Sequence, residues 1–320
     1  MPSDNEVVAA IDAVRAAGDL CVRAQGRLAA GDTLTKGDDS PVTVADFAAQ
    51  AVVCASLQDV LGEVVMIGEE DAGDLADRAT LLAGVTELVR GEREAGPAAV
   101  LDWISIGRGA GSASRYWTLD PIDGTKGFLR GDQYAVALGL IDDGEVVLGV
   151  LGCPNLPNPD GSIGATFAAV SGRCVAYYGE ASDAVDVRVA APATVADARF
   201  CESVESGHSD QDQSAQIASL LGLTTEPYRI DSQCKYAAVA RGDASIYLRL
   251  PTRADYREKI WDHAAGKFVV EQAGGCVTDV TGAPLDFSHG ARLEANRGVV
   301  ATAGGFHDEV VAAVMHVLGT

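Results

Sequence analysis

The 320-residue sequence predicts an α/β protein with an α+β N-terminal part, built on an antiparallel sheet, and an α/β C-terminal part. Apolar residues recur with a helical period near the N-terminus, and two hairpin patterns follow. After about residue 190, strands and helices alternate. This change of rhythm predicts two domains, residues 1–190 and 191–320, with a site at the seam between them.

The N-terminal part is expected to begin with two helices. Residues 5–30 carry apolar side chains at helical spacing, and a second helix is expected over about 43–61. Thr43 and Asp46 have the spacing of a capping box at the start of that helix. The short β-branched run 64–67 ends at a glycine and predicts a buried strand.

The next segment, 71–114, is rich in glycine, alanine and acidic residues, and we expect it to form a helix and a mobile loop over the site. Strand 116–119 follows and ends on an Asp-Pro pair. Two hairpins are then expected, with turns at Asp-Asp-Gly and Ser-Gly. They pair residues 134–141 with 145–151 and 165–170 with 173–178.

Glycines end several of the helices expected in the C-terminal part. The expected elements of this part are strands near 198–204, 244–250 and 299–302, and helices near 209–221, 232–241, 260–273 and 306–318.

The composition excludes two classes of partner. A formal charge of −22 repels nucleic-acid polymers and anionic membranes. Most of the 46 acidic residues must form a solvated surface, and the excess could reflect a salty interior or a GC-rich genome. A subset could collect metal ions.

The cysteines and the N-terminus predict a soluble cytoplasmic protein. The seven cysteines are scattered and never in CxxC spacing, which argues against a disulfide framework and a zinc site. We find no apolar run approaching the roughly 20 residues of a membrane span, and no signal-peptide pattern.

Carboxylates gather in three short segments, each at the end of an expected strand or the start of an expected helix. Hard cations such as Mg²⁺ prefer such oxygen ligands, and the carbonyl of Ile122 could add another. The N–H groups at Gly124 and Thr125 could hold a phosphate. A metal cluster beside a phosphate site is the arrangement that two-metal phosphoryl transfer requires. The segments are Gly68-Glu69-Glu70-Asp71, Asp120-Pro121-Ile122-Asp123-Gly124-Thr125 and Trp261-Asp262-His263.

Each segment also has a purely structural interpretation. Asp262 could complement a helix dipole, and Asp120-Pro121 could be a strand-to-turn junction. Glu69 and Glu70 could lie in a solvated loop, and Asp46 could serve only its capping box.

Taken together, the motifs resemble the inositol monophosphatase superfamily of lithium-sensitive phosphatases. WTLDPIDGTKGF (117–128), IGEED (67–71) and EKIWDHAAGKFVVEQAGG (258–275) carry this resemblance, which extends from about residue 6 to 305. It implies a layered αβαβα fold of the sugar-phosphatase type. The segments that are similar to the 3′(2′),5′-bisphosphate nucleotidase branch are KGDDSPVTVADFAAQ (36–50), DPIDGTKGFLRGDQYAVAL (120–138), ESGHS (205–209), DSQCKYAAVARGDASIYLRLP (231–251) and PLDF (284–287).

The resemblance implies a role for each matching residue. Asp46 and Thr125 would polarise the attacking water, Thr125 passing its proton toward Asp46, while Gly124 and Thr125 hold the phosphate. Glu70 would support the metal site. The ligands of two or three Mg²⁺ ions would be Glu69, Asp120, the Ile122 carbonyl, Asp123 and Asp262, and the substrate-binding residues would be His208, Ser209, Ser232, Lys235 and Arg249.

A structural alternative stands beside two of the substrate-binding assignments. Arg249 offers a planar fork for phosphate, but it could be a surface arginine at a strand edge. His208 could equally be a loop histidine with no task.

The expected function is hydrolysis of the 3′-phosphate of 3′-phosphoadenosine 5′-phosphate, a by-product of sulfur metabolism, to AMP and phosphate. The sulfated precursor, 3′-phosphoadenylyl sulfate, would be a second substrate. An inositol polyphosphate 1-phosphatase or inositol monophosphatase is the alternative, because the same catalytic residues serve both. A non-catalytic binding protein should lack one of these residues, and a calcium buffer should carry a DxDxDG loop, which does not occur. The relatives suggest a monomer that is inhibited by lithium.

Overall fold

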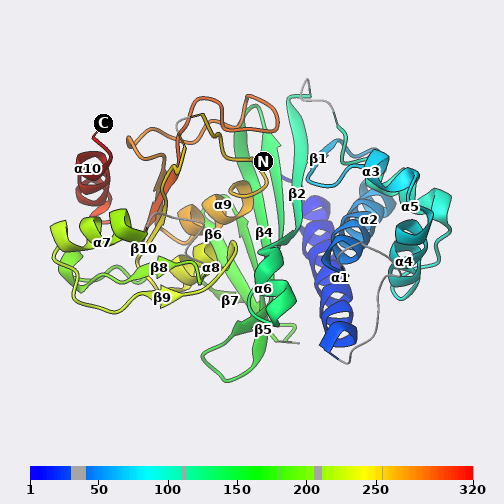
Figure 1. The fold of residues 1–320 in the computed structure, drawn as a ribbon, viewed down its shortest axis with the longest axis horizontal. Coiled ribbons are helices and arrows are strands. Elements are labelled where there is room, and N and C mark those ends of the chain that lie inside the picture. Colours follow the sequence, from blue (N-terminus) through cyan, green and yellow to red (C-terminus); the bar gives the residue numbers. More distant parts are fainter. Residues whose placement is uncertain (30–40, 110–112, 180, 205–210, 254, 320) are drawn as a thin grey trace.

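The computed structural model describes residues 1–320 except 30–40, 110–112, 180, 205–210, 254 and 320. Helices and sheets alternate in five layers, in the order helices, sheet, helices, sheet, helices (Figure 1). The predicted α/β class and the αβαβα layering are both confirmed.

The first layer is formed by α1 (Asp4–Ala29) and α2 (Pro41–Leu61), which pack side by side against the first sheet. Residues Thr43–Leu61 of α2 are long and apolar enough to cross a membrane, which we did not expect, but 72% of that window is buried inside the protein. It is therefore a core helix. The predicted capping box is wrong, because α2 begins at Pro41 and Thr43 lies within its first turn.

Three short helices follow where we expected one helix and a mobile loop. They are α3 (Ala72–Ala76), α4 (Ala79–Arg90) and α5 (Pro97–Ser105), and the last two pack against the outer side of α2 (Figure 1). The expected mobile loop is therefore wrong for residues 72–105, most of which are helical, while residues 110–112 of the predicted segment lie outside the described residues. Alanines and glycines between the leucines and valines concealed a helical face that these helices bury.

The first sheet has seven strands in chain order, and every neighbouring pair is antiparallel except β1 and β2, which are parallel. The strands predicted near 64–67 and 116–119 and both predicted hairpins are confirmed. Strand β7 has only two residues, which is too short to show a pattern in the sequence. The strands are β1 (Met66–Gly68), β2 (Arg115–Asp123), β3 (Ala135–Asp142), β4 (Glu145–Pro157), β5 (Ile163–Val170), β6 (Arg173–Tyr178) and β7 (Val185–Asp186).

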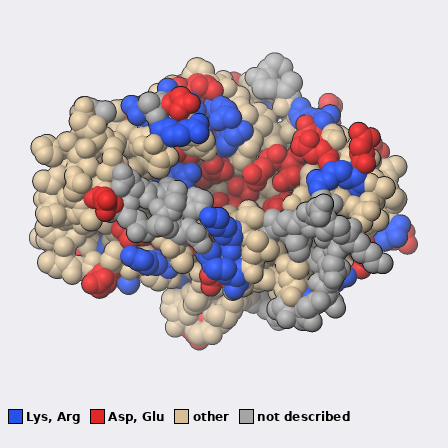
Figure 2. Space-filling view, viewed as in Figure 1, with Lys and Arg blue, Asp and Glu red and all other residues tan. Residues whose placement is uncertain are grey.

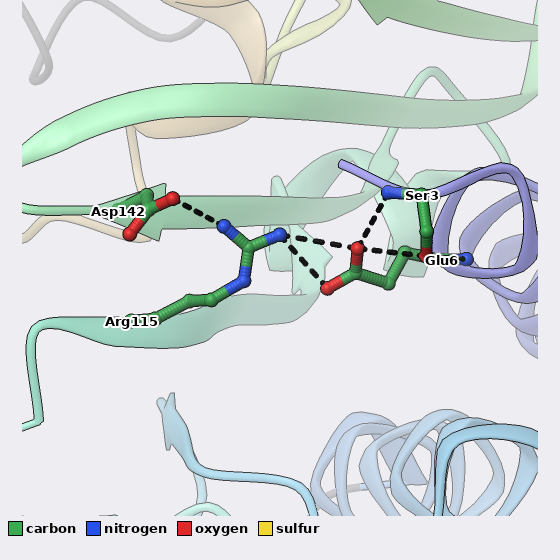
Figure 3. A network of polar contacts seen from close by, with 4 residues as sticks. All are labelled: Ser3, Glu6, Arg115 and Asp142. Carbon is green, nitrogen blue, oxygen red and sulfur yellow. Dashed lines mark hydrogen bonds and ion pairs between the residues drawn. The ribbon is translucent and has the colours of Figure 1, made fainter. Parts of the chain in front are cut away.

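A polar network fastens the start of α1 to this sheet (Figure 3). Arg115 of β2 donates two hydrogen bonds to the Glu6 carboxylate, at 2.9 and 3.1 Å, and pairs on its other side with Asp142 of β3. The backbone N–H of Ser3 also donates to Glu6, at 2.7 Å. One guanidinium thus joins two strands to the helix that covers them.

The middle layer consists of α8 (Cys234–Arg241) and α9 (Ala264–Gln272), which lie between the two sheets. The two helices approach closely at Gly266, where a Cβ atom would lie 2.2 Å from a ring carbon of Tyr236. Only glycine fits there, so the closeness of α8 and α9 depends on this residue.

The second sheet has the order β11–β12–β10–β8–β9, and α7 (Gln211–Leu220) and α10 (His307–Leu318) cover its outer face (Figure 1). The expected strands and helices of this part are all present, while β9 and β11 escaped prediction because they are two and three residues long. The strands are β8 (Phe200–Glu202), β9 (Tyr228–Arg229), β10 (Ile246–Arg249), β11 (Cys276–Thr278) and β12 (Val299–Thr302).

Candidate functional site

A cavity of about 460 Å³ opens where the edge of the first sheet meets the middle helices and the second sheet. Acidic side chains gather in a hollow at the centre of this face, and basic side chains border it (Figure 2). The cavity is lined by Glu69, Asp120, Ile122, Asp123, Gly124, Thr125, Lys126, Gly127, Ser203, Asp231, Ser232, Gln233, Lys235, Tyr247, Arg249, Asp262 and His263.

Strand pairing brings the first two carboxylate segments together. In the parallel pair of β1 and β2, Gly68 lies opposite Leu119, so both strands reach the cavity at the same edge. The N–H of Glu69 donates to the carbonyl of Leu119 at 3.1 Å, directly before Asp120. The third segment, Trp261-Asp262-His263, arrives from the turn that leads into α9.

A tight turn at Gly124 leads from β2 into α6 (Thr125–Arg130). Gly124 has a φ of 90°, and a Cβ atom there would lie 2.8 Å from the Cβ of Ser232. Glycine satisfies both constraints. The close approach joins the start of α6 in the N-terminal half to the turn before α8 in the C-terminal half.

The carboxylates that line the cavity are buried beside too few positive charges to neutralise them. Burial and then the neighbouring Glu69 and Asp123 carboxylates raise the pKa of Asp120 well above its usual range. Burial, followed by Asp123 and Glu69, does the same for the pKa of Asp262. Atom Oδ1 of Asp120 is buried and, among the described residues, has no hydrogen-bond partner.

Asp46 and Glu70 lie next to this set. Burial, then the charges of Glu70 and Glu69, raises the pKa of Asp46, which is 7% exposed. Burial, then Glu69 and Asp74, raises the pKa of Glu70 to about 7. An all-oxygen donor set with an unpaired buried oxygen fits a hard divalent cation, which would supply the missing positive charge.

A second acidic group overlaps this set. Ligand atoms of Glu258, Asp262 and His263 lie within 4.8 Å of one another. Glu258, however, already pairs with Arg249 at 3.4 Å and with His263 Nε2 at 3.3 Å. Asp262 lines the cavity together with Asp123 and Glu69, whose charges raise its pKa, so we group it with the carboxylates of the cavity.

Basic and hydroxyl groups line another part of the same cavity, which we call the basic wall. Lys235, in the first turn of α8, is 6% exposed, and its Nζ lies 5.3 Å from the ring centroid of Tyr247. Burial lowers the pKa of Lys235, and the nearby Asp123 carboxylate opposes that shift. Arg249 is the last residue of β10. Ser232 directly precedes Gln233, which is the N-cap residue of α8.

The structure therefore brings together, in or beside one cavity, every predicted site residue that it describes. His208 and Ser209 lie outside the described residues.

Two buried glutamines escaped the sequence analysis. The carboxamide of Gln50 accepts from the backbone N–H of Glu70 at 3.0 Å and donates to the carbonyl of the same residue at 2.6 Å. Gln233 contacts the segments of Asp123 and Asp262. Each glutamine stands inside a motif quoted for the resemblance, which is the signal that could have found it.

Comparison with known proteins gives a match to the inositol monophosphatase family over residues 3–318. A 3′(2′),5′-bisphosphate nucleotidase of Schizosaccharomyces pombe is 43% identical, with 98% of this chain and 96% of the relative covered. One from Emericella nidulans is also 43% identical, with 89% and 91% covered.

Solved structures share the fold. An inositol monophosphatase of Zymomonas mobilis superposes with a TM-score of 0.64 at 18% identity, covering 98% of this chain and 99% of the other. CysQ of Bacteroides thetaiotaomicron gives 0.62 at 20% identity, covering 92% and 96%.

Proposed function

The chain belongs to the inositol monophosphatase family, and we propose that it is a 3′(2′),5′-bisphosphate nucleotidase. It hydrolyses the 3′-phosphate of 3′-phosphoadenosine 5′-phosphate to AMP and phosphate, and it accepts 3′-phosphoadenylyl sulfate in the same way. The observation that carries this proposal is a single cavity with an acidic wall for metal and a basic wall for a second phosphate. Relatives that bear this name match nearly the whole chain.

The acidic wall is proposed to hold two or three Mg²⁺ ions. Its buried, unpaired Asp120 oxygen and its raised carboxylate pKa values support this assignment. Bound magnesium supplies the positive charge that lowers the pKa of water and neutralises phosphate oxygens. Glu70 supports the site, and the ligands are Glu69, Asp120, the Ile122 carbonyl, Asp123 and Asp262.

Protein groups orient the water and the transferring phosphate. The Thr125 hydroxyl accepts a hydrogen bond from the attacking water and donates its own proton toward Asp46. The backbone N–H groups of Gly124 and Thr125, at the start of α6, face the phosphate that is transferred. Because water is the nucleophile, no residue of the chain becomes phosphorylated.

The basic wall selects the substrate. Arg249 presents a planar fork to the second phosphate, and Lys235 adds a buried positive charge beside it. The hydroxyl of Ser232 lies in the same wall. His208 and Ser209 are assigned to substrate binding on the sequence resemblance.

Several wider properties belong to the same proposal. The enzyme is a cytoplasmic monomer acting on a small molecule. Residues 1–190 carry most of the metal ligands, and residues 191–320 carry Asp262 and the groups that bind the nucleotide.

The test is to identify the products. With 3′-phosphoadenosine 5′-phosphate and Mg²⁺ in H₂¹⁸O, we expect AMP and phosphate carrying one ¹⁸O atom. Adenosine 3′-phosphate as the nucleotide product would show that the 5′-phosphate is attacked and would overturn the assignment of the two walls. Phosphate free of ¹⁸O would exclude the attack of water at phosphorus.

A further inference from the structure

We infer that Gln233 is a positioning residue that fixes Asp123 relative to Asp262, and thereby sets the geometry of the proposed metal site. The inference rests on the proposed function, because it takes these two aspartates to be metal ligands. Gln233 is 2% exposed and lies between Ser232 and the first turn of α8.

The backbone of Gln233 holds the first aspartate. Its N–H donates a hydrogen bond to Oδ2 of Asp123, more than 100 residues away in the sequence. Ser232, directly before it, has a φ of 65°, which non-glycine residues seldom adopt. Such conformations persist where the surrounding structure holds them, and Ser232 lies close against Gly124.

The side chain of Gln233 holds the second aspartate from both sides. Its Nε2 donates to the carbonyl of Trp261 at 2.8 Å, and its Oε1 accepts from the N–H of Gly266 at 3.0 Å. Trp261 directly precedes Asp262, and Gly266 lies in the first turn of α9 that follows it. The N–H of Gly266 is one of the helix-terminal donors that need an external partner.

One residue thus makes three hydrogen bonds that join three segments of the chain. A glutamine is suited to this task, because its carboxamide donates and accepts at once without adding charge to an acidic site. Partners of this kind commonly change metal affinity or activity by 10- to 100-fold when they are removed. The three contacts therefore predict a role in metal affinity as well as in folding.

The test compares Gln233→Met, which keeps length and volume but removes both side-chain hydrogen bonds, with Asn296→Leu as a matched control. Asn296 is 3% exposed, accepts from the N–H of Asp286 at 2.8 Å and donates to the carbonyl of Pro284 at 2.9 Å. It makes the same kind of clamp away from the cavity. Both variants should lose thermal stability.

Binding of Mn²⁺ alone is measured by electron paramagnetic resonance, beside kcat and KM with Mg²⁺ and the nucleotide. For Gln233→Met we expect the Mn²⁺ dissociation constant to rise and kcat to fall by about 10- to 100-fold. KM should change by less than about threefold, because the two hydrogen bonds that are removed hold Trp261 and Gly266 rather than the side chains assigned to the second phosphate. Asn296→Leu should bind Mn²⁺ within about twofold of the wild type.

Equal Mn²⁺ affinity in the two variants, at similar losses of stability, would reduce Gln233 to a structural residue and overturn the inference. If Gln233→Met does not fold, Gln233→Asn, whose shorter amide cannot reach both partners, is judged by the same criterion. A wild-type protein that binds no Mn²⁺ would overturn the proposed function itself. If the wild type binds Mn²⁺ and turns over the nucleotide, and Gln233→Met does both equally well, only the role of Gln233 is refuted.

Discussion

Replacing Asp120 with Asn is expected to stabilise the metal-free protein while abolishing its activity. Asp120 is 3% exposed, and its Oδ1 has no hydrogen-bond partner among the described residues. Burial and the carboxylates of Glu69 and Asp123 make its charged form unfavourable when no cation is bound. Asparagine keeps the shape of the side chain and removes that charge.

The magnitude follows from the charge that asparagine removes, because aspartate and asparagine both leave a buried polar atom at this position without a partner. One ionised carboxylate about 5 Å away repels another by about 3 kcal/mol at an effective dielectric constant of about 20. Because the wild type avoids part of this repulsion by binding protons, we expect Asp120→Asn to gain about 1–3 kcal/mol in EDTA. For a protein of 320 residues that is roughly 1.5–4.5 °C in Tm.

Thermal unfolding of both proteins in EDTA and in excess Mg²⁺ measures the effect. Mg²⁺ at a thousand times its dissociation constant stabilises the wild type by about 4.1 kcal/mol, so the order of the two Tm values should reverse. Asp279→Asn is the control, since Asp279 is 4% exposed and its Oδ1 accepts from the N–H of Thr281 at 2.8 Å. That variant should lose stability in both buffers. An Asp120→Asn protein that melts at or below the wild type in EDTA would refute the reasoning.

Three further predictions concern other parts of the molecule. Arg249→Ala should reduce kcat/KM for the nucleotide bisphosphate by at least about tenfold more than for inositol 1-phosphate, and equal losses would contradict its assignment to the second phosphate. Burial lowers the pKa of His307 below its value in the unfolded chain. As the pH falls below about 6.5, the unfolded chain therefore binds a proton at His307 before the folded protein does, and the folded protein loses stability. His307→Gln should therefore lose less Tm than the wild type between pH 7.5 and 5.5, and parallel losses would refute this. Arg115→Met should cost about 1 kcal/mol in urea unfolding, an effect that salt should weaken because Arg115 is partly exposed; a larger effect in high salt would contradict the ion-pair account.

The elements nearest the site were the most predictable from the sequence. The strand that carries Asp120 and the helix that follows Asp262 have strong local patterns, and their carboxylates meet as the motifs implied. The three helices of 71–114 were not predictable in the same way, because alanine and glycine obscure a helical period that packing against α2 then enforces.

The two glutamine clamps show a different limit. Gln50 and Gln233 act through contacts with segments 20 to 110 residues away, and no local periodicity encodes such contacts. The same holds for Thr43, whose position in α2 depends on where the helix begins rather than on its spacing from Asp46. Long-range hydrogen bonds and helix starts thus required the structure.

The central claim is tested most directly by measuring Mg²⁺-dependent phosphate release from 3′-phosphoadenosine 5′-phosphate, inositol 1,4-bisphosphate and inositol 1-phosphate in parallel, with and without lithium. We predict strong preference for the nucleotide and loss of that activity with lithium. Preference for an inositol phosphate would keep the metal chemistry and overturn the substrate. A folded, magnesium-loaded protein that releases phosphate from none of the three would contradict the account as a whole.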